Sequence, residues 1–120
     1  RDVLVRSTLA ARRPVDEPER LEKMLQHGNL IITARDNGKL IGVSRSLTDF
    51  AFCTYLSDLA VDETYQKQGI GKELIRQTKL ASPKAKLILL AAPAAINYYP
   101  KIGMTKFEYC YVLDKVEDLG

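Results

Sequence analysis

The stretch from Thr54 to Ala91 constrains the fold most, because it reads as a strand, a helix and a second strand in succession. Residues 54–61 are mostly apolar, as in a strand in the middle of a sheet. Residues 70–81 carry apolar side chains at helical spacing, and Ser82–Pro83 ends this helix because a residue before proline resists helical geometry. Residues 86–91 form a short apolar run that favours a buried strand. Such a crossover predicts two parallel strands in one sheet.

An antiparallel hairpin precedes this crossover. Residues 30–34 and 40–45 read as strands, and the Asn37–Gly38 pair between them is a strong hairpin signal. A last strand is expected over residues 107–113, which are rich in aromatic and β-branched side chains. Together these elements predict a mixed sheet with helices on its faces, of the α/β (α+β) class.

Three further helices are expected around the sheet. The first covers residues 2–11. The second begins at Asp16 as its N-cap and ends at Gly28 as the C′ residue. A short helix over residues 94–99 is expected to stop at Pro100.

Length and composition exclude several classes of protein. With 120 residues, 46% of them hydrophobic and 28% charged, the chain is expected to form a single globular domain over residues 1–120. The net charge of +3 is modest and does not indicate a nucleic-acid partner. No apolar run approaches the length of about 18 residues that a membrane span needs, so no membrane partner is expected.

The cysteine and histidine counts bound the chemistry further. Cys53 and Cys110 cannot make a disulfide scaffold, and we expect both to be small buried or half-buried residues. A single histidine argues against a His-rich metal centre, so no metal is expected. No secretory signal is visible, although the chain opens at Arg1 rather than Met. The reducing cytoplasm is therefore the expected location.

A glycine-containing loop joins strand 54–61 to the helix that begins at Ile70. Its sequence is Gln66-Lys67-Gln68-Gly69-Ile70-Gly71-Lys72. Backbone N–H groups at a helix start have no internal acceptors, and the helix dipole is positive there, so an anion fits. Gly69 and Gly71 lack a Cβ and allow close approach, while the glutamine and lysine side chains add donors and positive charge. The loop predicts a diphosphate site. Both established glycine-rich phosphate patterns are absent, which leaves open a turn whose glycines only relieve crowding.

Two separated blocks resemble one family. Gln66-x-x-Gly69-x-Gly71, preceded by Leu59-Ala60-Val61, is similar to the acetyl-CoA-binding signature of the GNAT superfamily of N-acetyltransferases. The segment from Tyr98 to Met104 resembles that family's late F-Y-x-K-x-G-F block. The resemblance implies a mostly antiparallel central sheet with a V-shaped splay between its central parallel strands. It also implies that the fold's first strand lies upstream of Arg1.

The resemblance implies acetyl-CoA as co-substrate, without a metal. The backbone of three strand residues would hold the pantetheine arm and the acetyl carbonyl: Leu59, Ala60 and Val61. The loop and helix start would hold the diphosphate: Gln66, Lys67, Gln68, Gly69, Ile70, Gly71 and Lys72. Relatives often carry a cofactor-binding asparagine where this chain has Ala92, and Asn97 is expected to replace that contact.

Two side chains are expected to take part in catalysis. By the resemblance, Tyr99 protonates the departing thiolate, which suits a phenol with a pKa of about 10; the alternative is that Tyr99 only packs under the cofactor. Tyr98 is expected in the core. Relatives often place a glutamate where this chain has Tyr55, so Asp58 is the nearest candidate for the general base. Asp58 can equally be a hydrogen-bonded carboxylate, with the amine deprotonated through a water chain.

The expected acceptor is a primary amine of a small molecule or a peptide, and dimers are common among similar proteins. Phe50, Phe52 and Tyr55, with Asp49, lie where relatives form the acceptor cleft, and either line it or fill the core. Arg12 and Arg13 recognise an acidic substrate or simply face solvent. Two other functions stay open: a non-catalytic acyl-CoA-binding or regulatory module, and a structural dimerisation domain that binds no coenzyme.

Overall fold

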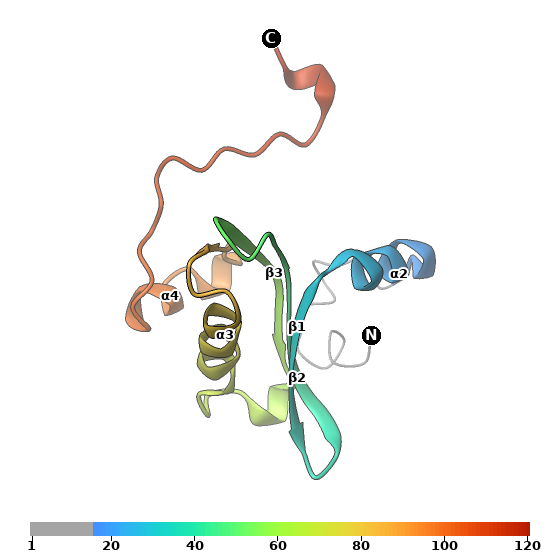
Figure 1. The fold of residues 1–120 in the computed structure, drawn as a ribbon, viewed down its shortest axis with the longest axis vertical. Helices are drawn as coiled ribbons and strands as arrows, with labels where there is room; N and C mark the ends of the chain where they lie inside the picture. The colour runs from blue at the N-terminus through green and yellow to red at the C-terminus, as the bar shows by residue number, and fades with distance from the viewer. Residues whose placement is uncertain (1–15) are drawn as a thin grey trace. The chain divides into compact units, whose positions relative to one another are not determined.

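The structure is a computed structural model that describes residues 16–120 (Figure 1). The expected helix over residues 2–11 and the arginines at 12 and 13 lie outside the described residues. Two compact units divide the chain: one ends at Leu90, and the other runs from Ala91 to Gly120. The elements are α2 (Pro18–His27), β1 (Leu30–Asp36), β2 (Lys39–Thr48), β3 (Cys53–Val61), the 3₁₀ turn η2 (Glu63–Tyr65), α3 (Ile70–Ala81), β4 (Lys86–Ile88), η3 (Pro93–Ala95), α4 (Tyr98–Lys101) and η4 (Val116–Asp118).

Four strands form one mixed sheet in the order β1-β2-β3-β4. The first three strands are antiparallel, and β3 pairs with β4 in parallel. Asn37 and Gly38 both have positive φ, 50° and 84°, as a tight hairpin turn with the right twist requires. The mixed sheet, the hairpin and the central place of β3 are thereby confirmed, as is the helix over residues 70–81 with the bounds expected from the sequence.

Helices α2 and α3 cover opposite faces of the sheet (Figure 1). On the α2 face, Leu21 packs with Ala60 to form a small apolar cluster. The α3 face is bonded through buried hydroxyls: Ser44 Oγ lies 2.8 Å from Thr78 Oγ1, and Thr54 Oγ1 lies 3.0 Å from Ser82 Oγ. Buried hydroxyl groups are tolerated when each has a hydrogen-bond partner. The interface between the sheet and α3 is therefore held by hydrogen bonds as well as by apolar contacts.

Helix α2 differs at both ends from the expectation. Its N-cap is Glu17 rather than Asp16, because Pro18 takes the first helical position, where its fixed φ is favourable. Gly28 is the C-cap and has φ −75°, not the left-handed geometry of a C′ glycine. A Cβ at Gly28 would lie 2.8 Å from Arg45 Cγ. The glycine is therefore needed for space, not for backbone freedom.

The region after α3 departs most from the expectation. Strand β4 ends at Ile88 rather than at residue 91, and Pro100 lies inside α4 instead of stopping a helix at residue 99. A proline is accepted there because the first turn needs no N–H donor.

The expected strand over residues 107–113 is wrong. These residues are not in a strand and are exposed, with Tyr109 at 73% and Tyr111 at 92%. Strand propensity mainly reflects packing on a pleated surface, and no strand is paired with this segment within the described chain.

The burial of three single side chains also differs from the expectation. Tyr98, expected in the core, is 38% exposed, and Cys53 and Cys110, expected to be buried or half-buried, are both exposed.

Candidate functional site

The link between β3 and α3 is a short, tightly bonded turn. Asp62 is buried, its N–H donates to Ile41 O over 2.8 Å, and its Oδ1 accepts from both the N–H and the hydroxyl of Thr64. Gln66 Nε2 donates to Val61 O over 2.8 Å. The Gln66 side chain therefore ties the loop back to the end of β3.

The loop then passes through two left-handed residues. Lys67 has φ 66° and Gly69 has φ 82°. A Cβ at Gly69 would meet nothing within 4 Å, so this glycine is required by its backbone conformation and leaves open space beside the chain. A left-handed lysine costs about 1–2 kcal/mol. Such strain is typical of segments whose geometry serves a site.

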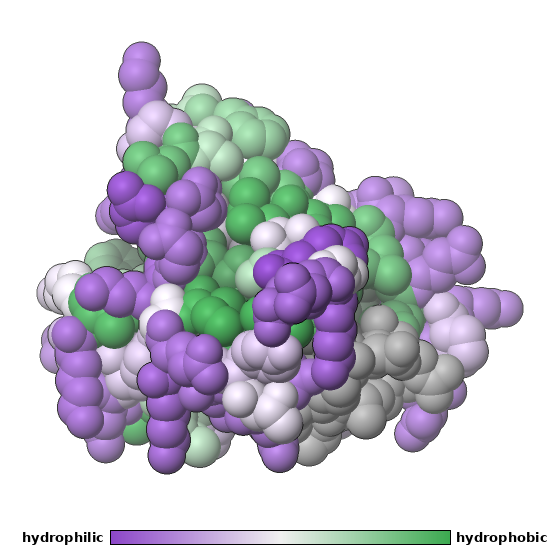
Figure 2. Space-filling view, turned by 90° about the horizontal axis from the view of Figure 1, so that it is seen from below, coloured by the Kyte–Doolittle hydropathy of each residue, from purple (hydrophilic) through white to green (hydrophobic). Residues whose placement is uncertain are grey.

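Helix α3 starts without a side-chain cap. Its N-cap is Gly69, which has no side chain to accept a hydrogen bond from the first turn. Helix-start N–H groups lack intrahelical acceptors and lie at the positive end of the dipole. Lys67 and Lys72 are exposed beside them. Figure 2 looks from below onto the end at which α3 begins, and hydrophilic side chains project from it.

One carboxylate also lies in this first turn. Glu73 accepts from Gln77 Nε2 over 2.7 Å and from Arg76 Nη1 over 3.2 Å. The hydrogen bond from Gln77, with the charge of Arg76, lowers the pKa of Glu73. Gln77 and Arg76 both lie further along α3, so their hydrogen bonds orient the Glu73 carboxylate toward the second turn of the helix.

The described pairing of β3 with β4 ends well before β3 reaches the loop. The pairing covers only Cys53–Lys86, Thr54–Leu87 and Tyr55–Ile88. From Leu56 to Val61, no described strand pairs with β3 on the side opposite β2. The expected splay between the parallel strands corresponds to this early end of pairing between the described parts of β3 and β4.

Along this part of β3 lie the three strand residues predicted to hold the coenzyme arm. Leu59 and Val61 are half-buried, and Ala60 is buried against the α2 face. The structure thus brings together the predicted strand residues, the loop and the helix start as one continuous stretch of chain.

Asp58, the candidate general base, is only 3% exposed. Its Oδ2 accepts a hydrogen bond from Arg45 Nε, in an ion pair between two buried side chains. The placement favours the alternative of a hydrogen-bonded carboxylate. Sequence reasoning missed Arg45, whose only signal was a charge inside a largely apolar strand.

Tyr99 and Asn97 belong to the second unit. Tyr99 is half-buried, its ring lies edge-on to that of Tyr98 with centroids 5.3 Å apart, and its carbonyl accepts from the N–H groups of Ile102 and Met104. Asn97 is exposed and is the N-cap of α4, without a side-chain cap bond. The roles predicted for Tyr99 and Asn97 stay predictions.

The turn between β2 and β3 is built around Asp49. Its Oδ1 accepts from the N–H groups of Ala51, Phe52 and Cys53, and these bonds, that of Phe52 foremost, lower the pKa of Asp49. Phe50 has φ 59°, and the exposed fractions of Phe50 and Phe52 are 50% and 79%. The two phenylalanines do not fill the core, and their expected place in the acceptor cleft stays a prediction.

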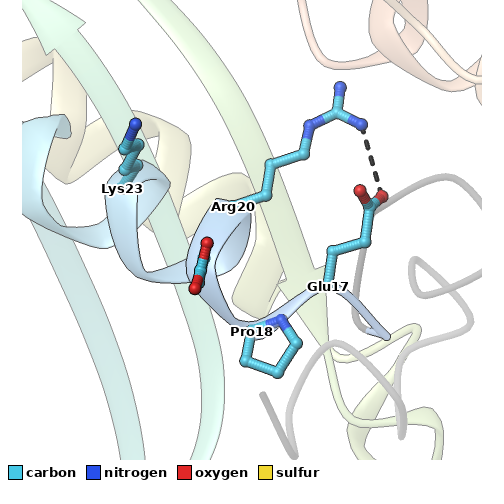
Figure 3. A pocket seen from close by; sticks show the side chains of 5 residues that line it. Glu17, Pro18, Arg20 and Lys23 are labelled. Carbon is cyan, nitrogen blue, oxygen red and sulfur yellow. Dashed lines mark hydrogen bonds and ion pairs between the residues drawn. The ribbon is translucent and has the colours of Figure 1, made fainter.

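A hollow of about 580 Å³ lies at the start of α2 (Figure 3). Its lining is Glu17, Pro18, Glu19, Arg20 and Lys23. The Arg20–Glu17 ion pair that crosses it, 3.4 Å long, is exposed and of the kind that contributes little. None of these lining residues belongs to β3, to the loop after it or to α3.

Within residues 16–120, no helix is long and apolar enough to cross a bilayer. The same residues contain no group of three or more His, Cys, Asp or Glu side chains arranged to hold a metal ion.

Comparisons with known proteins agree with this geometry. A beta-lysine N(6)-acetyltransferase of Methanococcus maripaludis is 29% identical over 100 residues, which are 82% of this chain and 36% of that protein. The structure of a GNAT family acetyltransferase from Streptococcus pneumoniae matches with a TM-score of 0.71 at 25% identity, covering 82% of this chain and 78% of that one. An aminoglycoside N-acetyltransferase solved with CoA shares the fold, with a TM-score of 0.64 at 16% identity over 83% and 86% of the two chains.

The chain spans about a third of the length of the first curated relatives that it matches, 36% and 29%. The model of the acetyltransferase (GNAT) family matches residues 2–104, which is most of the sequence. The chain therefore belongs to the GNAT family of acetyltransferases, a family of acyltransferase enzymes.

Proposed function

We propose that this chain transfers the acetyl group of acetyl-CoA directly to a primary amine of a small molecule or a peptide. The observation that carries the proposal is the start of α3, whose N-cap Gly69 offers no side-chain cap and which a short loop joins to the part of β3 beyond its last described pair with β4.

The start of α3 suits the coenzyme's diphosphate. The N–H groups of Ile70, Gly71 and Lys72 would donate to its oxygens, and Lys67 would offset its charge. The left-handed Gly69 leaves open space at the point of approach. Anions are stabilised at helix starts by the same donors and dipole. The Gln66 side chain supports this site by fixing the loop to Val61.

The edge of β3 suits the pantetheine arm. A strand without a partner presents N–H and C=O groups that an extended amide chain can pair with. The backbone groups of Leu59 and Val61 would bind the arm and lay the thioester along the edge. Two ends of the coenzyme would then be held by consecutive parts of the chain, which fixes the reacting carbonyl.

The reaction needs an amine, an oxyanion donor and an acid. The neutral amine attacks the thioester carbonyl, the C–N bond forms, and the C–S bond of the tetrahedral intermediate breaks. A backbone N–H of β3 would stabilise the oxyanion. Tyr99 would protonate the departing thiolate and regain a proton from the amine nitrogen through water. No dedicated base is assigned, because Asp58 is paired with Arg45.

A second function, a non-catalytic acyl-CoA-binding or regulatory module, is favoured by the same pairing of Asp58 and by Tyr55 at the position where relatives often carry glutamate.

One experiment separates the enzyme from the non-catalytic module. Calorimetric titration with acetyl-CoA is followed by a thiol-release assay with β-lysine, an aminoglycoside and a lysine-containing peptide. Binding with thiol release supports the enzyme, and binding without release under any amine supports the module. Absence of binding supports a structural domain.

The proposed enzyme works in the cytoplasm. The support is chemical: Cys53 and Cys110 are both exposed free thiols, which a reducing compartment keeps reduced.

A further inference from the structure

The register between β2 and β3 slips by one residue at Ser57. Arg45 lies opposite Asp58, whereas the next residue of β2, Ser46, lies opposite Leu56. Ser57 is therefore an extra residue in β3 and makes a β-bulge. Such a bulge bends its strand and increases the local twist.

The bulge lies just beyond the end of the described pairing between β3 and β4. The last pair between β3 and β4 is Tyr55–Ile88, two residues before Ser57. The bend that a bulge introduces therefore falls just beyond the last pair with β4. The bulge thus marks where β3 begins to present the edge that the proposed function assigns to the coenzyme.

Arg45 holds both residues of the bulge with one guanidinium. Nε donates to Asp58 Oδ2, Nη2 donates to Ser57 Oγ over 3.0 Å, and Nη1 donates to Met24 O over 3.0 Å. The planar group has a fixed fork of donors. It therefore ties the bulge of β3 to the last turn of α2 in one orientation.

The Arg45 and Asp58 side chains are both buried, and Gly28 leaves room for the arginine. Arg45 is 7% exposed and Asp58 is 3% exposed. A Cβ at residue 28 would lie 2.8 Å from Arg45 Cγ, so the missing Cβ of Gly28 leaves room for the arginine side chain. A buried ion pair is weak evidence for stability, since apolar pairs often serve as well. Stability alone therefore does not account for an arginine at this position.

We propose that Arg45 is a positioning residue for acetyl transfer: through Ser57 and Asp58 it holds the β3 bulge so that the strand edge beyond it meets the thioester carbonyl. This inference rests on the proposed function. Arg45 touches neither substrate, and its effect falls on turnover rather than on coenzyme affinity, because the diphosphate loop lies beyond Val61 at the other end of the edge.

The test uses variants that keep the region packed. The double variant Arg45→Met with Asp58→Leu replaces the ion pair by apolar side chains, and Arg45→Lys keeps the charge without the three-way fork. Arg20→Met removes an exposed ion pair on α2 and serves as the control. Each is compared by thermal unfolding, by calorimetric affinity for CoA and by kcat with whichever amine of the panel releases CoA fastest.

A spectroscopic readout works without an amine. The ¹³C shift of the carbonyl of [1-¹³C]acetyl-CoA reports hydrogen bonding to that oxygen in the bound state. In the wild type we expect this signal to move from its position in free acetyl-CoA. In both Arg45 variants it moves back toward the free position, while the CoA Kd stays within about twofold and kcat falls about 100-fold. Arg20→Met behaves as wild type.

Two results would overturn the inference. One is a folded Arg45 variant with wild-type kcat and carbonyl shift. The other is a loss of kcat matched by an equal loss of CoA affinity or of folded protein, as a purely structural role requires. Failure of the proposed function looks different: the wild type binds acetyl-CoA and releases no thiol with any amine, and the carbonyl shift then decides about Arg45.

Discussion

The two ends of the part of β3 that runs from the bulge to the loop are built in opposite ways. At the bulge, the guanidinium of Arg45 is buried and bonded to Asp58, Ser57 and a carbonyl of α2. At the loop, the start of α3 has no side-chain cap, and Gly69 has open space beside it. The closed end has its polar groups paired within the protein, and the open end leaves donors for a ligand. Affinity for the coenzyme should therefore depend on the loop, and turnover on the bulge.

Gly71→Glu should have the largest effect. A side chain and a negative charge then stand at the helix start that receives the diphosphate, and we expect CoA affinity to fall at least about 100-fold in calorimetric titration. A carboxylate in a first turn interacts favourably with the helix dipole, so the variant is expected to fold. Leu80→Glu, exposed near the other end of α3, is the control for charge. Micromolar binding by a folded Gly71→Glu protein would contradict the assignment of the loop.

Tyr99→Phe should lower turnover by about 100-fold, within the range of a general acid, and leave CoA affinity nearly unchanged. The neighbouring Tyr98→Phe is a matched control, because it removes an exposed hydroxyl one residue away. The measurement is kcat across pH with the best amine. An unchanged pH profile in Tyr99→Phe would remove the acid role.

Gly28→Ala should destabilise the closed end. The added Cβ would lie 2.8 Å from Arg45 Cγ, so the arginine has to move. Overpacking of this kind costs about 1–3 kcal/mol, measured by denaturant unfolding. In an Arg45→Ala background the same change should cost much less, because the clash has gone. Equal costs in the two backgrounds would show that Arg45 does not occupy this space.

Tyr65→Phe should have the smallest effect, confined to high pH. Tyr65 OH donates to Asp36 Oδ2 over 2.8 Å, and this bond raises the pKa of Tyr65 above its ordinary value of 10.0. The neutral phenol is favoured in the folded state, so its contribution is fully present below the unfolded pKa and is lost as pH rises through the raised one.

Wild type and Tyr65→Phe should therefore differ in unfolding midpoint at about pH 8 and converge once the pH has risen through the raised pKa of Tyr65. A difference that stays constant across this range would mean that the bond to Asp36 does not control the titration of Tyr65.

Local signals in the sequence predicted the regular elements well. Asn37–Gly38 predicts its turn because both residues accept positive φ, and Ile70–Ala81 combines helical spacing with a proline stop. The strand predicted over residues 107–113 is wrong, because aromatic residues indicate a strand only where a neighbouring strand pairs with them. The loop from Gln66 to Lys72 could be singled out because its glycine spacing is local, and its role in binding a diphosphate stays a prediction.

The bulge and its arginine could not be found in that way. A register slip at Ser57 depends on how β2 and β3 pair, and neither strand shows it alone. Arg45 and Asp58 are 13 residues apart, and Met24 comes from a different element. Such contacts are products of tertiary packing.

The central claim is that backbone amides at the start of α3 bind the diphosphate of CoA. A crystal structure of this chain with CoA tests it most directly. We expect diphosphate oxygens within hydrogen-bonding distance of the N–H groups between Gln68 and Lys72, with the pantetheine arm along β3. A structure in which CoA is bound elsewhere, with these amides facing water or their own side chains, would contradict the account.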